Sequence, residues 1–399
     1  MMRRVLKIRK DKVVFLRGNV LVIGNSGVGK STLINAVLGE ERALTGYGIS
    51  GTTKDLEIYE SEELPFRVID TIGFEPTFLK ERMAIRAVQN WSKNCAKEGK
   101  EDNQINVIWF CVDGTSRKLF PKAIQSLARA TDIWKSVPIV VVITKSYSVP
   151  ERAENIEMVE KAFASQKKCG RNLKKILPVV AATYELNETA FAVPEGITEL
   201  IDATNELMPE GVQAGSYDLA NYKLGRRRYL AQGVVGVSTT SAVVVGAVPI
   251  PVADALILSP LELAEVNAIA RIYGVKNDEK SKQLFNSIVE VGTVSAAARA
   301  LISALKSIPG LNIGASVLNA VIAGSIVAAL GEGTIYIFEQ IYLGKKSFQD
   351  IDWVKKVLES KLSTEVLEKT KKLLGMTDGE LDAKKLAKMI LDAIKGAKK

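Results

Sequence analysis

The fold is decided by the stretch VLVIGNSGVGKST, residues 20–32. Its first four residues are apolar and predict a buried strand, and a helix-forming run continues to Leu38. Between them lies G-x-x-x-x-G-K-S, in the strand–loop–helix context that makes this motif specific. We therefore expect the loop to cradle phosphate groups.

The residue types of this loop explain its chemistry. The glycines at 24, 27 and 29 let backbone N–H groups turn inward toward phosphate oxygens, and the start of the following helix adds partial positive charge. Lys30 can reach the β- and γ-phosphates, and the Ser31 hydroxyl can ligate Mg²⁺. The predicted nucleotide-binding residues of the loop are Asn25, Ser26, Gly27, Val28, Gly29, Lys30, Ser31 and Thr32.

The composition excludes several classes of protein. The chain has 399 residues, enough for two or three domains, with 47% hydrophobic and 25% charged residues. It has no histidine, which excludes Ser-His-Asp catalysis and His-ligated metals. Three widely spaced cysteines without a CxxC pattern and the absence of an apolar signal core in residues 1–17 predict a reduced, cytoplasmic location. The net charge of +9 permits an anionic membrane or nucleic-acid partner without requiring one.

Strands and helices alternate along residues 1–208, which predicts an α/β domain with a mainly parallel sheet and helices on both faces. The strands are expected at 20–23, 55–61, 66–70, 105–112, 138–143 and 176–180. The helices are expected at 77–96, 119–135, 151–168 and 197–208. Residues 40–54, with three glycines, are expected to form a mobile loop.

The second half has a different composition. After a linker at residues 209–216, residues 217–343 are rich in Gly and Ala and predict an all-α domain, and residues 344–399 predict amphipathic, basic helices. Residues 229–253 and 307–331 contain no charge and are long enough for membrane helices. Arg226-Arg227-Arg228 precedes the first like a positive-inside flank. A tightly packed soluble domain and a membrane-inserted or peripheral domain both fit this pattern.

Two further motifs follow the loop. Asp70-Thr71-Ile72-Gly73 ends an apolar strand, where the acid can hold Mg²⁺ through a water and the glycine N–H can meet a γ-phosphate. Gly51-Thr52-Thr53-Lys54-Asp55 lies earlier, where a threonine hydroxyl can complete the Mg²⁺ shell. Each match is short, but their order and spacing behind the loop make the set specific.

GNSGVGKST, GTTKD and DTIG in this order resemble the regulatory GTPases of the Era/TrmE-like branch, over residues 18–208. The resemblance implies a P-loop NTPase G domain that binds GTP or GDP with Mg²⁺ and hydrolyses GTP. It implies that Ser31, Asp70 and either Thr52 or Thr53, with Thr53 favoured, hold the metal. It also implies that Lys30, Thr53 and Gly73 act on the γ-phosphate.

The positions that read the base depart from the family pattern. Thr144 and Lys145 match the N/T-K-x-D motif, but Tyr147 stands where its aspartate should be. Ala181-Ala182-Thr183 replaces Ser-Ala-x, so that a backbone N–H can still reach the base. GTP is expected from the resemblance, with ATP or loose specificity as the alternative.

Hydrolysis is expected to be slow. Phe74 follows Gly73 where a water-orienting glutamine stands in Ras-like proteins, and Gly27 replaces the asparagine with which members of this branch recruit K⁺. An activating partner or a second copy of the chain would then supply the missing group in trans.

Residues 222–345 resemble the helical domain of unknown function 697, found behind such GTPase domains. This resemblance implies pairing with a GTPase and membrane association. We therefore expect a cytoplasmic switch that controls the helical domain at a membrane surface, at the inner face of that membrane. The alternatives are a ribosome- or RNA-associated assembly GTPase and a nucleotide-gated binding protein with little turnover; nucleic acid is the less expected partner.

Overall fold

The structure, a computed structural model, describes the chain in ranges: 7–9, 12–14, 17–39, 49–53, 56–61, 63–71, 104–116, 124, 136–166, 170–187, 190–213, 219–247, 258–276, 278–279, 281–294, 315–362, 369, 372 and 382–395. The chain forms two compact units. The first comprises residues 1–182 and 194–226, and the second comprises residues 183–193 and 227–399.

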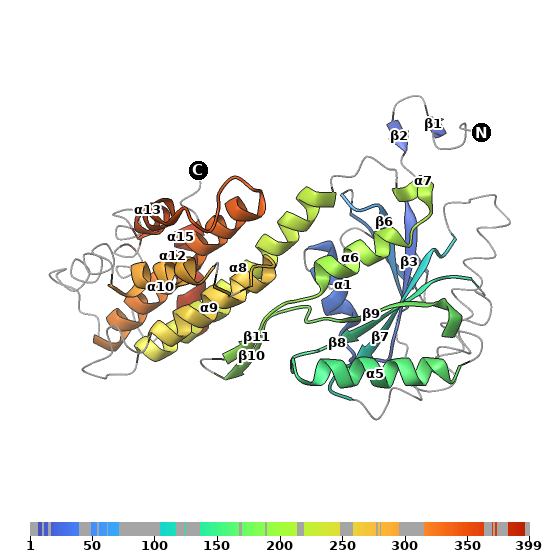
Figure 1. Cartoon of the computed structure of the whole chain (residues 1–399), viewed down its shortest axis with the longest axis horizontal. Helices are drawn as coiled ribbons and strands as arrows, with labels where there is room; N and C mark the ends of the chain where they lie inside the picture. The colour runs from blue at the N-terminus through green and yellow to red at the C-terminus, as the bar shows by residue number, and fades with distance from the viewer. Residues whose placement is uncertain are drawn as a thin grey trace. The chain divides into compact units, whose positions relative to one another are not determined.

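The first unit is built on a seven-stranded sheet of order β4-β5-β6-β3-β7-β8-β9 (Figure 1). Five neighbouring strands run parallel, while β4 and β5 pair antiparallel at one edge. The strands are β3 (Gly18–Ile23), β4 (Ile49–Thr53), β5 (Leu56–Tyr59), β6 (Phe66–Thr71), β7 (Val107–Asp113), β8 (Ile139–Thr144) and β9 (Leu173–Pro178).

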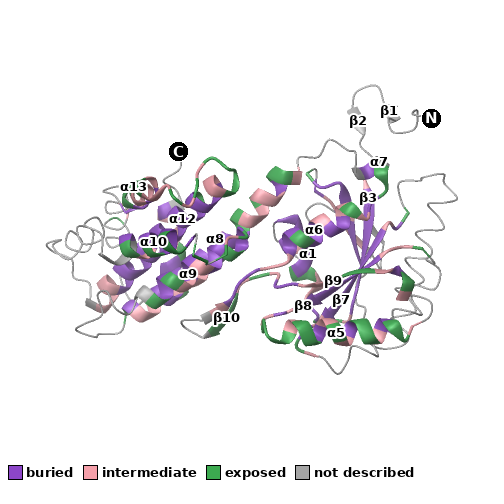
Figure 2. Cartoon of the chain, viewed as in Figure 1, coloured by how far each residue is buried: buried purple, intermediate pink, exposed green. Residues whose placement is uncertain are grey.

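Helices cover both faces of this sheet (Figure 1). On one face Val159 and Phe163 of α5 (Glu151–Ala164) pack against alternate residues of the central strands, such as Phe110. On the other face lie α1 (Lys30–Leu38) and α6 (Ile197–Glu206), and the indole Nε1 of Trp109 donates to Thr204 Oγ1 of α6 at 2.9 Å. Figure 2 shows the sheet as the buried layer. The predicted α/β domain is confirmed.

Several predicted boundaries shift. Ile49–Thr53 form β4, paired with β5, although residues 40–54 were expected to be a loop; the β-branched Ile49, Thr52 and Thr53 favour strand over loop. β9 begins at Leu173, three residues before the predicted start at 176. The prediction began too late because the exposed lysines 174 and 175 interrupt the apolar pattern of this strand. The predicted helix at 77–96 lies outside the described residues, as does that at 119–135 apart from Ile124.

Smaller elements complete the first unit and add a hairpin to the second. β1 (Lys7–Arg9) pairs with β2 (Lys12–Val14), and η3 (Gly170–Asn172) precedes β9. α7 (Glu210–Gln213) lies within the expected linker. β10 (Tyr184–Asn187) and β11 (Ala190–Ala192) form an antiparallel hairpin that belongs to the second unit.

Apart from that hairpin, the described part of the second unit is helical. Its helices are α8 (Leu219–Gly246, from Arg227 onward), α9 (Leu258–Ile272), α10 (Lys282–Val294), α12 (Ala315–Tyr342), α13 (Ile351–Lys361) and α15 (Ala383–Lys395). A Cβ added at Gly324 of α12 would lie 2.8 Å from both Ile390 Cδ1 of α15 and Val243 Cγ2 of α8. Small residues on α12 therefore allow its neighbours to approach closely.

The three consecutive arginines lie inside α8, directly before its uncharged part. Arg226 stacks over the Tyr222 ring at 5.3 Å and fills the space beside Gly39, the left-handed residue that ends α1. Arg227 Nη1 donates to Ile272 O at 2.9 Å, and Arg228 forms a bidentate ion pair with Glu339. All three side chains are thus engaged in intramolecular contacts.

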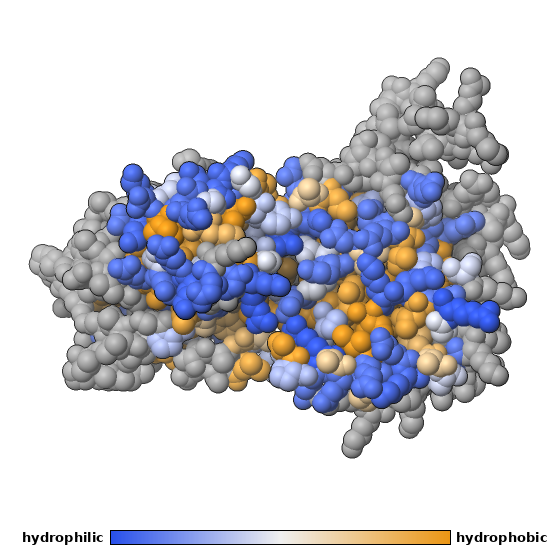
Figure 3. All heavy atoms as spheres, in the orientation of Figure 1, coloured by the Kyte–Doolittle hydropathy of each residue, from blue (hydrophilic) through white to orange (hydrophobic). Residues whose placement is uncertain are grey.

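Two of the described helices are long and apolar enough to cross a membrane, Leu219–Gly246 and Ser316–Tyr342. Half of the most apolar window of the first is buried inside the protein, against 94% of that of the second. The core helices of soluble proteins meet the same criterion. On the face of the molecule in Figure 3, hydrophilic side chains alternate with smaller hydrophobic areas over the described helices of the second unit.

Candidate phosphate-binding site

The predicted site residues gather at the carboxyl ends of the parallel strands. The loop follows β3, and the register of β3 with β6 pairs Val22 with Asp70. Asp113 ends β7, and Thr144 ends β8 in register with it. Because ligands of open α/β sheets bind outside the carboxyl ends of the strands, this edge is the place for a nucleotide.

The loop has the backbone shape that its glycines predict. Gly27 and Gly29 have φ values of +79° and +96°, a region that other residues rarely adopt. A Cβ at Gly24 would lie 2.6 Å from Cys111 O, so only glycine fits beside β7. Lys30 Nζ donates to Gly24 O at 3.0 Å and Asn25 O at 3.2 Å. The ammonium group is thus folded over the loop, where phosphate oxygens can replace these carbonyl partners.

The segment after β8 is fastened to this loop. Thr144 Oγ1 donates to Val28 O at 2.5 Å, or alternatively to Val112 O at 3.0 Å. Lys145, in the left-handed region with a φ of +52°, donates from Nζ to Gly27 O at 2.7 Å. The structure therefore brings together two motifs that lie more than a hundred residues apart in the sequence.

Asp113 is a site residue that the sequence analysis missed. Its Oδ2 lies 2.7 Å from Lys145 Nζ. Burial raises the pKa of Asp113, but hydrogen bonds from Lys145 and Thr115 outweigh it and leave the pKa below its ordinary value. The available signal was its place at the end of an apolar strand, the position that also marks Asp70.

A second ion pair joins the two segments expected to read the base. Arg152 Nε donates to Ser146 O at 3.0 Å, and Arg152 Nη1 lies 2.8 Å from Glu195 Oε2. The backbone of Glu195 pairs with Val180, directly before Ala181 and Ala182. Ala182 is exposed and Ala181 half-buried. Arg152 therefore fastens the segment after β8 to the segment after β9, a contact that no motif indicates.

The predicted metal ligands are placed only in part. Asp70 is 7% exposed at the end of β6, and Ser31 is exposed in the first turn of α1. Thr52 and Thr53 lie in β4, but their side chains are outside the described set, and so is Gly73. Among the described side chains, no three of His, Cys, Asp and Glu form a metal-binding group. A hydroxyl and a single carboxylate nevertheless suit Mg²⁺ bound together with phosphates, because this ion takes few protein ligands there.

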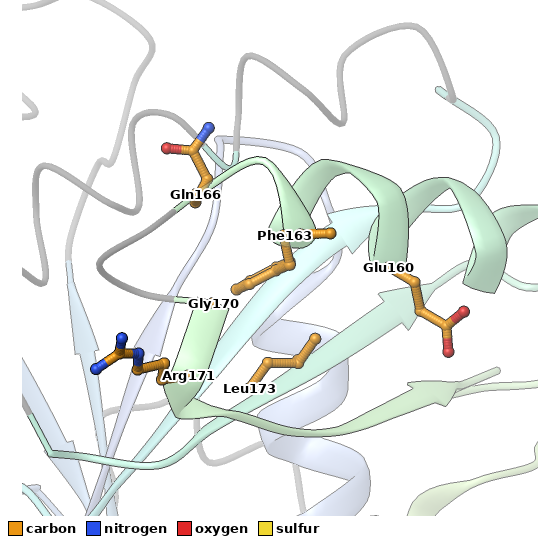
Figure 4. Close-up of a pocket in the computed structure, with 7 residues that line it drawn as sticks. Glu160, Phe163, Gln166, Gly170, Arg171 and Leu173 are labelled. Atoms are coloured by element: carbon orange, nitrogen blue, oxygen red, sulfur yellow. The ribbon is translucent and has the colours of Figure 1, made fainter.

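A cavity of about 500 Å³ lies elsewhere on the first unit (Figure 4). It is formed at the end of α5 and the start of β9, and Leu173 of β9 is in register with Ile139 at the start of β8. The cavity thus belongs to the amino-terminal edge of the sheet and not to the phosphate site. Its lining residues are Glu160, Phe163, Ala164, Gln166, Gly170, Arg171 and Leu173.

The two contacts of Lys145 lead to a prediction. Lys145→Ala removes the bond to Gly27 O and leaves Asp113 without its ion pair, so we expect nucleotide affinity to fall about tenfold, since a charge-assisted hydrogen bond contributes about 1.5–3 kcal/mol. Titration with a fluorescent nucleotide measures this. Lys145→Arg keeps a cation but not the geometry, so its nucleotide affinity should lie between those of the wild-type protein and of Lys145→Ala. An unchanged affinity in Lys145→Ala would mean that this contact does not shape the site.

Comparisons with known proteins agree with this geometry. Residues 19–145 match the family model described as 50S ribosome-binding GTPase, and residues 214–364 match a domain of unknown function, DUF697. A GTPase Der of Neisseria meningitidis serogroup B is 56% identical over 54 residues, which cover 13% of this chain and 11% of that protein. A tRNA modification GTPase MnmE of Azoarcus is 25% identical over 223 residues, covering 55% of this chain and 47% of that protein.

Among solved structures, a probable GTP-binding protein EngB is 19% identical, with 48% of this chain and 98% of that chain covered and a TM-score of 0.34. The chain spans about half, or less, of the length of the two curated relatives described above. Residues 19–145 are thus similar to the 50S ribosome-binding GTPase family, and residues 214–364 are similar to the domain of unknown function DUF697.

Proposed function

We propose that this protein is a GTP-binding switch that hydrolyses GTP slowly and whose nucleotide state controls the helical unit at a membrane surface. The observation that carries the nucleotide part is the pair of bonds from Thr144 and Lys145 to the carbonyls of Val28 and Gly27. They join the segment after β8, which is expected to contact the base, to the phosphate loop. A site for a whole nucleotide needs these two segments side by side. The matching family model and the relatives' names support GTP.

In this proposal the loop residues 25–32 bind the phosphates, and Thr144, Lys145, Ala181 and Ala182 surround the base. Ser31, Asp70 and one of the hydroxyls of Thr52 and Thr53 would hold Mg²⁺, which neutralises phosphate charge when bound. Lys30, Thr53 and Gly73 would act on the γ-phosphate. Hydrolysis is slow in this scheme because Phe74 offers no group to orient water.

The membrane part rests on the second unit. α15 is amphipathic: Leu386, Ala387 and Ile390 are buried, while Lys384, Lys385 and Lys388 are exposed. An exposed basic face is suited to anionic lipid headgroups. Self-association, or a partner acting in trans, is the proposed route to faster hydrolysis.

A second candidate function is an assembly GTPase on the ribosome or RNA. The observation in its favour is the description of the family model that matches residues 19–145. The same exposed lysines of α15 would then meet RNA phosphates. A third possibility, a nucleotide-gated binder, would show almost no phosphate release with GTP.

Cosedimentation separates these functions. We expect the protein to pellet with anionic vesicles more strongly with a non-hydrolysable GTP analogue than with GDP, or the reverse, but not equally. Replacing Lys384, Lys385 and Lys388 by glutamate should weaken vesicle binding about 100-fold, because each basic residue near an anionic surface contributes about 1 kcal/mol and about 1.4 kcal/mol corresponds to tenfold. Pelleting with ribosomes and not with vesicles would support the second candidate and contradict the membrane proposal.

A further inference from the structure

Three glutamates of the second unit are buried and have carboxylate oxygens that make no hydrogen bond within the described part of the chain. Glu262 and Glu265 of α9 are both 0% exposed, and Glu332 of α12 is 7% exposed. Both carboxylate oxygens of Glu262 and Glu265, and Oε1 of Glu332, make no hydrogen bond within the described part of the chain. We call these three residues the glutamate cluster.

The cluster lies where α9 meets α12. A Cβ added at Gly331 would lie 2.5 Å from Glu265 Oε1 and 2.7 Å from Val235 Cγ2 of α8. The carboxyl group of Glu265 therefore lies directly against the backbone of α12 and beside an aliphatic side chain. Leu261, one turn earlier on α9, packs with Ala242, Ala323 and Val327 in an apolar layer. Glu265 is thus part of a helix contact that is otherwise apolar.

A fourth buried glutamate of this unit, in contrast, has hydrogen-bond partners for its carboxylate. Glu339, two turns after Glu332 on α12, is 2% exposed. It accepts two hydrogen bonds from Arg228 and one from Tyr273 Oη. A buried carboxylate with a bidentate cation of this kind keeps its charge. Within the described part of the chain no cation forms a hydrogen bond with Glu262 or Glu265, and Arg228 acts on Glu332 electrostatically without a hydrogen bond at its Oε1.

The charged groups that face Glu265 are all acids. On α9 itself the facing group is Glu262, and on α12 it is Glu332. Burial raises the pKa of Glu262 to about 7. Burial raises the pKa of Glu265 well above its ordinary value, and the charges of Glu262 and Glu332 raise it further.

A charged carboxylate in an apolar interior is so costly that the group takes up a proton instead. We propose that Glu262 and Glu265, with Glu332 facing them from α12, form a proton-binding site: the two α9 glutamates hold α9 against α12 while they are protonated, and the contact loosens when their protons leave. The ligand of this site is the proton, and the described side chains do not form a metal-binding group there. This inference is independent of the nucleotide site.

The direction of the pH effect follows from linkage. A glutamate whose pKa is higher in the folded state binds a proton that the open state releases at intermediate pH. The protonated glutamates stabilise the contact between α9 and α12 fully at pH values below the ordinary glutamate pKa. This stabilisation is lost as the pH rises above the ordinary glutamate pKa. The loss extends through the raised pKa of about 7 for Glu262, and to higher pH for Glu265. The helix contact should therefore be weaker at pH 8 than at pH 6.

Hydrogen exchange of the full-length protein tests this, read on the amides of Leu258–Ile272. After correction for intrinsic exchange, with α5 as the reference helix, we expect the opening constant to rise about tenfold or more between pH 6 and pH 8, since each released proton contributes up to a tenfold change per pH unit. Glu265→Gln, a neutral mimic of the protonated acid, should flatten this dependence and reduce opening at pH 8. Glu262→Gln and Glu332→Gln should each flatten it in part.

The matched control is Glu339→Gln, a buried but paired glutamate on the same helix bundle. It should raise opening at both pH values by a similar factor, because it removes the partner of Arg228 whatever the pH. A wild-type opening constant that does not change with pH would overturn the proposal, and it would indicate a neutralising cation from a segment outside the described residues. A wild-type dependence that all three glutamine variants retain would also overturn it.

Discussion

Replacing Lys30 with alanine is expected to lower the affinity for GTP about 100-fold or more, the largest binding effect of any single substitution in the chain. Lys30 Nζ lies over the loop, 3.0 Å from Gly24 O and 3.2 Å from Asn25 O. With nucleotide bound, the ammonium would instead meet two phosphates. Each charge-assisted bond contributes about 1.5–3 kcal/mol, and about 1.4 kcal/mol corresponds to tenfold in affinity. Titration with a fluorescent GTP analogue in Mg²⁺ measures the loss.

A matched lysine controls for the change in charge. Lys161 lies on α5, is largely exposed and pairs with Glu157 one turn away. Lys161→Ala should leave GTP affinity unchanged, because exposed pairs of this kind contribute little. If Lys30→Ala binds GTP like the wild-type protein, the assignment of the loop as the phosphate site is wrong.

The largest loss of stability is expected from Trp109→Ala. The indole is 0% exposed at the centre of the sheet, meets Phe66 edge-on with ring centroids 6.0 Å apart, and donates Nε1–H to Thr204 Oγ1 at 2.9 Å. Truncating a buried aromatic residue to alanine costs about 3–5 kcal/mol of unfolding free energy. Denaturant unfolding followed by circular dichroism measures the loss without relying on tryptophan fluorescence.

Two milder variants separate packing from hydrogen bonding at this position. Trp109→Phe keeps most of the ring contact but removes the donor, so we expect a smaller loss than in Trp109→Ala. Thr204→Val keeps the volume but leaves the buried indole N–H without its acceptor, at a cost of about 1–3 kcal/mol. A loss below about 1 kcal/mol for Trp109→Ala would show that this layer is not tightly packed.

Local sequence patterns predicted the elements in which neighbouring residues all favour the same structure. The P-loop was predictable because strand, glycine loop and helix follow one another within nineteen residues, and the buried strands β3, β7 and β8 are continuous apolar runs. The helical character of the second half followed from its Gly/Ala-rich stretches. These features depend on neighbours in sequence, which a single chain displays directly.

Contacts between distant residues escaped prediction. Asp113 and Lys145 are 32 residues apart, and Arg152 and Glu195 are 43 apart, so no local period reveals either pair. The contacts of Arg227 and Arg228 also escaped prediction, because their partners Ile272 and Glu339 lie on other elements. β4 was not predicted because its glycine indicated a loop. The strand is stabilised by pairing with β5, which its own sequence does not show.

Selectivity for the base tests the proposed GTP switch most directly, because Tyr147 stands where the base-reading acid is expected. The measurement is competition of unlabelled GTP and ATP for a bound fluorescent nucleotide on the full-length protein in Mg²⁺. We expect GTP to compete at least about tenfold better than ATP, because one additional good hydrogen bond to the base corresponds to about that factor. Equal competition, or stronger competition by ATP, would contradict the proposed GTP switch.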